Sequence, residues 1–131
     1  MGSVLLDTTV VIDLLRGREG AAARLRSLRQ AGDSPHVCAI TVEETVRGLR
    51  PKEREAARAL FDGLRTVPLG SDEGWQAGEW RRENAARGRA LTRADCLVAS
   101  AALAIGARLA TGNPRDFPMA GVQVDHWPVG V

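Results

Sequence analysis

Four acidic residues stand where apolar strands end or helical segments begin. Asp7 follows the apolar run at residues 4–6, Glu44 and Asp95 lie near the starts of two helical stretches, and Asp116 lies in a loop. Carboxylates brought close together repel one another unless they take up protons or bind a cation. Because carboxylate oxygens suit hard divalent ions, the pattern predicts a Mg²⁺ site, with Mn²⁺ as the alternative metal.

An acidic pocket that holds a divalent ion is suited to phosphoryl chemistry. The cation can lower the pKa of a bound water and stabilise charge on a leaving oxygen. It also reverses the sign of a field that would otherwise repel a phosphodiester. Neither His36 nor His126 lies near the acidic motifs, so we expect both histidines to be structural and a zinc site to be absent.

Each acid also has an ordinary structural explanation. Thr41 and Glu44 have the spacing of a capping box, and Asp95 follows Thr92 at the same spacing. The other two acids could cap a helix and form a turn, respectively. Both interpretations therefore stay open for each residue taken alone, and only convergence of all four acids favours chemistry.

The elements that must position these acids alternate between strand and helix. Short apolar segments predict strands at residues 3–6, 36–40, 65–69, 107–111 and 122–127, and apolar spacing predicts helices at residues 10–15, 19–31, 41–49, 51–64, 71–87 and 92–105. Such alternation predicts an α/β three-layer fold, with a mostly parallel sheet of about five strands flanked by helices. Ligands of these sheets bind beyond the carboxyl ends of the strands, which is where all four acids fall.

Length and composition indicate one domain, residues 1–131, because 44% hydrophobic residues can form a substantial core. Both cysteines, Cys38 and Cys96, are expected to be buried thiols. Trp75 and Trp80 are expected to be core anchors. The sequence contains neither a membrane-length apolar run nor a leader pattern, which predicts a cytoplasmic protein that does not span a membrane.

The formal net charge is +2, and Lys52 is the one lysine among 18 basic residues. Arginine suits bidentate phosphate contacts, although a genome with a coding bias toward arginine, alanine and glycine is the better explanation of this composition. Gathering the acids in one pocket would leave the remaining surface more positive, which permits a nucleic-acid ligand. Arg93 and Arg115 flank two of the acids and are candidates either for phosphate contacts or for ordinary solvated positions.

Four motifs in order, "LLDTTVVIDLLRG", "ITVEETVRGL", "LTRADCLVASAAL" and "LATGNPRDFP", span nearly the whole chain. Together they resemble the PIN domain, and in particular the VapC toxins of bacterial type II toxin–antitoxin systems. The resemblance implies a magnesium-dependent endoribonuclease that inhibits growth by blocking translation. It also implies a homodimer, and a VapB-type antitoxin whose C-terminal segment occupies the active-site groove.

Carried over by motif, the resemblance assigns the catalytic acids to Asp7, Glu44 and Asp95, with Asp7 and Asp95 as metal ligands. The fourth acid varies within the family. Asp116 is assigned to that position, while Asn113 stands where an acid is often found and is interpreted as a water- or substrate-binding group.

The remaining assignments concern the substrate. Thr9, Arg93 and Arg115 are interpreted as RNA-binding residues, and Thr9 could equally be a local cap.

Two other phosphate-handling folds agree less well with the sequence. A haloacid dehalogenase-type phosphatase needs a second aspartate where Thr9 stands, and Lys52 follows the wrong element to serve as its lysine. A response-regulator receiver needs an aspartate after the third strand and a lysine after the last. The non-enzyme alternative is a catalytically silent PIN-like module that binds RNA or protein, for which clustered acids would be an unrelieved cost.

Overall fold

The computed structural model describes residues 2–131. Its strands are β1 (Ser3–Leu6), β2 (Ser34–Cys38), β3 (Arg65–Val67), β4 (Arg108–Thr111) and β5 (Val124–His126). Its α-helices are α1 (Thr8–Leu15), α2 (Glu19–Gln30), α3 (Ala39–Arg47), α4 (Arg54–Asp62), α5 (Ser71–Ala86) and α6 (Arg93–Ala104). Two short 3₁₀ helices, η1 (Pro51–Glu53) and η2 (Pro114–Asp116), complete the set.

The five strands form one parallel sheet in the order β3-β2-β1-β4-β5, which confirms the predicted fold class. The strand order reverses at β1, since the chain first adds β2 and β3 on one side and later β4 and β5 on the other. The carboxyl ends of β1 and β4 therefore border the crevice where ligands of such sheets bind.

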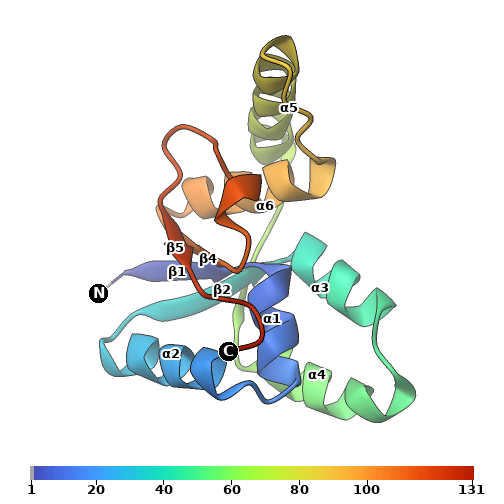
Figure 1. Cartoon of the computed structure of the whole chain (residues 1–131), viewed down its shortest axis with the longest axis vertical. Helices are drawn as coiled ribbons and strands as arrows, with labels where there is room; N and C mark the ends of the chain where they lie inside the picture. Colours follow the sequence, from blue (N-terminus) through green and yellow to red (C-terminus); the bar gives the residue numbers. More distant parts are fainter. Residues whose placement is uncertain (1) are drawn as a thin grey trace.

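Helices cover both faces of the sheet, with α5 and α6 on one side and α1, α2 and α4 on the other (Figure 1). Successive side chains of β1 point to opposite faces of the sheet, so this one strand contributes to the cores on both sides. Leu5 belongs to the core under α5 and α6, whereas Val4 and Leu6 belong to the core under the other helices. Because β1 is the central strand and is buried on both faces, Asp7 follows the centre of the sheet.

The second strand ends earlier than its sequence predicts, and this changes the role of Thr41. Helix α3 begins at Ala39 with Cys38 as its N-cap residue, so Thr41 lies inside the first turn and is fully buried. The predicted capping box between Thr41 and Glu44 is therefore wrong. By contrast, the Thr92 hydroxyl accepts a hydrogen bond from the Asp95 amide at 3.1 Å, which confirms that cap.

The prediction that Trp75 is a core anchor is also wrong. Trp80 is buried with 4% of its surface exposed, whereas Trp75 is 76% exposed. Five residues at about 100° each place the two indoles about 140° apart on α5. Because α5 packs against α6 on one side and stands away from the sheet (Figure 1), only one of them reaches the core.

Cys38 and Cys96 are buried free thiols, as predicted. Across residues 2–131, no helix has the length and apolar character needed to cross a membrane.

Candidate active site

Asp7 lies directly after β1 and caps the N-terminus of α1, so it is both a structural cap and the first candidate acid. Its side chain is buried, with 6% exposed. Asp7 Oδ1 accepts the Thr8 amide at 2.7 Å, and Oδ2 accepts the hydroxyls of Thr111 at 2.7 Å and Thr9 at 3.1 Å. Burial raises the pKa of Asp7, and these hydrogen bonds oppose the rise.

Glu44 approaches Asp7 from α3 because the two helices α1 and α3 pack side by side. The Thr8 hydroxyl donates to Glu44 Oε1 at 2.7 Å and lies 3.5 Å from the Thr41 hydroxyl. Thr8 therefore contacts both acids, since its amide binds Asp7 and its hydroxyl binds Glu44. The charge of Glu44 contributes to the raised pKa of Asp7.

Asp95 lies in the first turn of α6 and is half-buried. Burial raises its pKa to about 6; a hydrogen bond with Thr92 opposes this rise, and the charges of Asp116, Asp7 and Glu44 add to it. Three other carboxylates thus act on Asp95 even though they come from separate parts of the chain. The four predicted acids share one electrostatic environment at the carboxyl edge of the sheet.

The donor chemistry of this cluster suits a hard cation. Its oxygen atoms belong to carboxylates and threonine hydroxyls, and a positive ion would relieve the repulsion that adds to the effect of burial on the pKa of Asp95. Within residues 2–131, however, no three acidic, histidine or cysteine side chains converge closely enough to hold an ion directly. The described residues therefore offer no direct three-ligand site, and a divalent cation is compatible with them only if water supplies part of its coordination, as is usual for Mg²⁺.

The predicted substrate-binding residues differ in whether they line a cavity beside the acids. Arg115 and Asp116 line a cavity of about 430 Å³ together with Asp95. Arg93 is exposed at the start of α6 and is not among the residues that line this cavity. Asn113 is exposed, and its backbone N–H donates to the Thr111 hydroxyl at 3.0 Å, so its main chain supports a residue that binds Asp7.

The Thr9 hydroxyl is hydrogen-bonded to protein atoms on both sides. Its hydroxyl donates to Asp7 Oδ2 at 3.1 Å and accepts the Gly112 amide at 2.9 Å. The structure thus gives Thr9 a supporting role toward Asp7.

Two supporting residues were missed by sequence reasoning. Thr8 and Thr111 bind the acids directly, and Thr111 could have been noticed as the last residue of a strand that ends at the same edge as Asp7.

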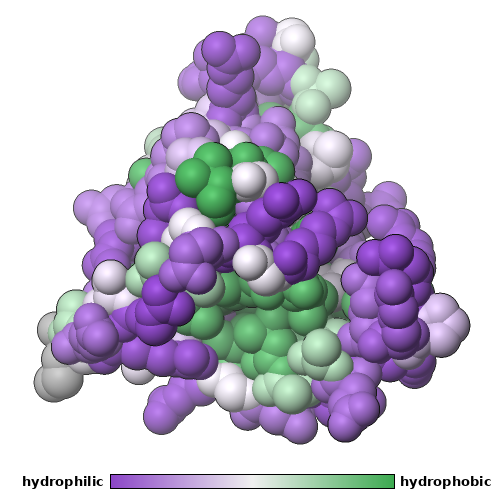
Figure 2. Space-filling model, turned by 60° about the horizontal axis from the view of Figure 1, so that its bottom comes forward, coloured by the Kyte–Doolittle hydropathy of each residue, from purple (hydrophilic) through white to green (hydrophobic). Residues whose placement is uncertain are grey.

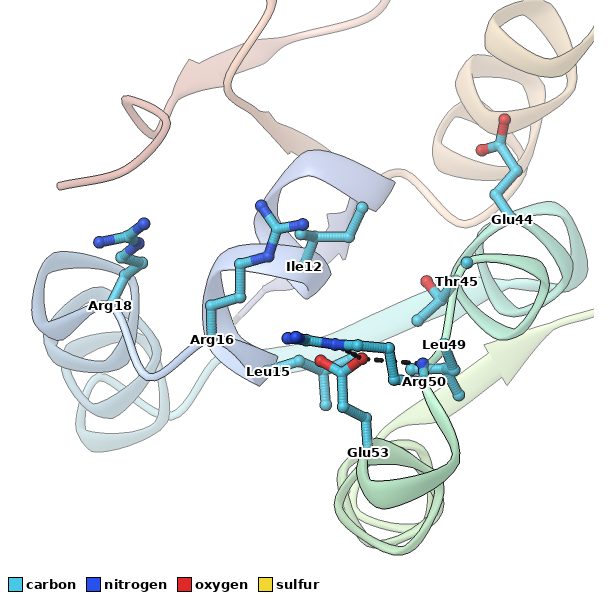
Figure 3. Close-up of a pocket in the computed structure, with 10 residues that line it drawn as sticks. Ile12, Leu15, Arg16, Arg18, Glu44, Thr45, Leu49, Arg50 and Glu53 are labelled. Atoms are coloured by element: carbon cyan, nitrogen blue, oxygen red, sulfur yellow. Dashed lines mark hydrogen bonds and ion pairs between the residues drawn. The ribbon is translucent and has the colours of Figure 1, made fainter.

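A second cavity, of about 530 Å³, lies between α1, α3 and η1, and Glu44 is one of the residues that line it. Its apolar lining includes Ile12, Leu15 and Leu49, and its arginines are Arg16, Arg18 and Arg50 (Figure 3). Arg50 also pairs with Glu53 at 3.0 Å, as Figure 3 shows. Seen from the side on which α2 and α4 lie, the molecule has an apolar hollow bordered by hydrophilic residues (Figure 2).

Comparison with known proteins decides the family of this acid-lined α/β fold. The model of the PIN domain family matches residues 4–121. The chain belongs to the PIN-domain family. Among curated proteins, this PIN domain is similar to Ribonuclease VapC19 of Mycobacterium tuberculosis, with 31% identity over 115 residues, 88% of this chain and 92% of the relative. That similarity makes it a member of the VapC family.

Two solved structures share the fold of this PIN domain. The DNA-bound VapBC structure from Salmonella typhimurium superposes with a TM-score of 0.85 at 22% identity, over 97% of this chain and 99% of that chain. FitAcB from Neisseria gonorrhoeae superposes with a TM-score of 0.75 at 27% identity, over 92% of this chain and 95% of that one.

Proposed function

We propose that this VapC-family PIN domain is a Mg²⁺-dependent endoribonuclease toxin that acts in the cytoplasm and inhibits growth by blocking translation. Membership of a family that contains a named ribonuclease supports the activity. The observation that carries the proposal is the shared environment of Asp7, Glu44, Asp95 and Asp116, in which the pKa of Asp95 is raised to about 6. Such a cluster is costly unless a cation neutralises it.

In this proposal Asp7 and Asp95 bind the cation, with Mn²⁺ as a possible substitute for Mg²⁺, and Glu44 and Asp116 contribute through water. When bound, the cation lowers the pKa of a water and offsets the charge of the phosphodiester. Cleavage by the activated water is expected to leave a 5′-phosphate and a 3′-hydroxyl.

The chain's own residues orient the acids and the substrate. Thr111 and Thr9 hold the Asp7 carboxylate through its Oδ2 atom. Thr8 donates to Glu44 Oε1, which leaves Oε2 as the less engaged oxygen that would accept a proton from water. Arg115 lines the cavity beside Asp95, where its guanidinium would bind a backbone phosphate of RNA.

We further propose a VapB-type antitoxin as the regulatory partner and a homodimer as the working assembly. The solved relatives named above include a VapBC complex, which supports the antitoxin. The cavity beside Glu44 offers apolar side chains and arginines within reach of the acids, as an inhibitory peptide segment would require. The 76% exposed Trp75 offers an apolar contact for a second subunit.

RNA cleavage with and without metal tests the activity. Purified protein should cleave a mixed RNA substrate in Mg²⁺, fail to do so in EDTA, and lose activity in Asp7→Asn. Asp62→Asn, an exposed change on α4, serves as the matched control and should cleave like the wild type. Induced expression should arrest growth for the wild type and not for Asp7→Asn. RNA binding without metal-dependent cleavage would favour the catalytically silent module instead.

A further inference from the structure

Residues 127–131, which we call the strap, follow β5 and pass alongside α1 toward α2 (Figure 1). The amide of Trp127 donates to the Thr111 carbonyl oxygen at 2.9 Å, which joins the start of the strap to the carboxyl end of β4. At its other end, the Gly20 amide in the first turn of α2 donates to the Val131 oxygen at 3.0 Å. The strap therefore links β4 and α2 across the side of α1.

Asp13 on α1 binds the strap at Gly130, next to its last residue. Its carboxylate is buried, with 5% exposed, and Oδ2 accepts the Gly130 amide at 2.8 Å. A buried carboxylate is costly unless it is hydrogen-bonded, so this bond matters to both partners. Asp13 takes no part in the acid cluster described above, although it lies on the same helix that Asp7 caps.

Val129 connects the strap to Gly112, in the loop that follows β4. A Cβ placed on Gly112 would collide with Val129 Cγ2, so the Val129 side chain packs directly on the Gly112 backbone. The Gly112 amide donates to Thr9 Oγ1 at 2.9 Å, and the Thr9 hydroxyl donates to Asp7 Oδ2 at 3.1 Å. Successive contacts therefore join Val129 of the strap to Gly112, Gly112 to Thr9, and Thr9 to Asp7.

We propose that Asp13 is a positioning residue for Asp7, acting through the strap. By holding Gly130, it keeps Val129 pressed on Gly112, and the Gly112 amide then fixes the hydroxyl of Thr9 toward Asp7. Both ends of this chain of contacts rest on α1, so a single rigid helix sets the distance between the anchor and the acid. The catalytic consequence rests on the proposed nuclease function, whereas the mechanical link does not.

Hydrogen exchange of the Gly112 amide, measured by NMR, tests the mechanical link without reference to activity. Asp13→Ala should speed this exchange by about tenfold or more, because the loop after β4 opens more often. Asp13→Asn keeps an acceptor oxygen for Gly130 and should restore near wild-type protection. Asp33→Ala is the matched control, since Asp33 likewise accepts a glycine amide, that of Gly2 at 2.7 Å, but at the opposite edge of the sheet.

Because Asp13→Ala could lose its fold, Val129→Ala provides a second variant at a position that is 55% exposed. It should speed Gly112 exchange in the same way, whereas Val131→Ala, 59% exposed, should not. Unchanged Gly112 exchange in both Asp13→Ala and Val129→Ala would overturn the inference.

RNA cleavage tests the catalytic consequence. Asp13→Ala should lower kcat by about ten- to hundredfold with little change in KM, as expected when a support of a catalytic carboxylate is removed. Asp13→Asn should recover most of the rate. A loss of kcat no larger than that of Asp33→Ala would overturn the positioning role. Absence of cleavage by the wild type would instead overturn the proposed function, and the exchange data would still decide the link.

Discussion

Replacing Asp95 by asparagine is expected to stabilise the metal-free protein at neutral pH. The pKa of Asp95 is raised to about 6 from an ordinary value of 3.8, mainly by burial and further by the charges of Asp116, Asp7 and Glu44. A tenfold change in proton affinity is worth about 1.4 kcal/mol, so the raised pKa corresponds to at most about 3 kcal/mol. Solvent screening of this half-buried group reduces the expected effect to about 1 kcal/mol.

The sign follows from proton linkage. Because the folded state holds the Asp95 proton more tightly than the unfolded state, the contribution to stability is complete below pH 3.8 and is lost as the pH rises through about 6. Asparagine carries no charge at any pH and shows no such loss. The free energy of unfolding of Asp95→Asn minus that of the wild type should therefore rise between these two pH values.

Urea denaturation in EDTA measures this difference. At about pH 7.5 Asp95→Asn should be about 1 kcal/mol more stable than the wild type, and near pH 4 the two should be nearly equal. The Thr92 cap survives the change because its hydroxyl accepts the backbone amide of residue 95. Asp62→Asn, exposed on α4, should show no comparable pH-dependent gain. A variant that is no more stable at neutral pH, or a difference independent of pH, would refute the raised pKa of Asp95 on which the prediction depends.

Three further predictions address the metal, the support of Asp7 and the core. Mg²⁺ should raise the midpoint of thermal unfolding of the wild type, because binding to the folded state alone stabilises it, and should raise it far less for Asp7→Asn; equal shifts would exclude Asp7 as a ligand. Thr111→Val keeps the side-chain shape but removes the 2.7 Å hydrogen bond to Asp7, and urea titration should show a loss of about 1–3 kcal/mol. An unchanged free energy of unfolding would contradict that role. By the same titration, Trp80→Ala should cost about 3–5 kcal/mol, whereas Trp75→Ala should stay within about 0.5 kcal/mol. Similar losses for both would mean that Trp75 is packed in solution.

The main elements of the fold were predictable because their signals are local. Apolar strands alternate with helical segments, and that pattern alone indicated the parallel sheet that the structure contains. Boundaries were less predictable. β2 ends at Cys38 rather than at residue 40, because pairing with β3 stops at Cys38 and Val67. That shift moved Thr41 from a predicted cap into the buried first turn of α3.

The sequence by itself determined which acids could act, since a carboxylate that directly follows a parallel strand, or that opens a helix running antiparallel to the strands, lies at the carboxyl edge of the sheet. Only the tertiary structure decided what surrounds them. Thr111 lies 104 residues from Asp7 and binds it, and the Asp13 bond to Gly130 spans 117 residues. Hydrogen bonds between such distant residues depend on strand order and helix packing, and neither is recorded in the local spacing of a single chain.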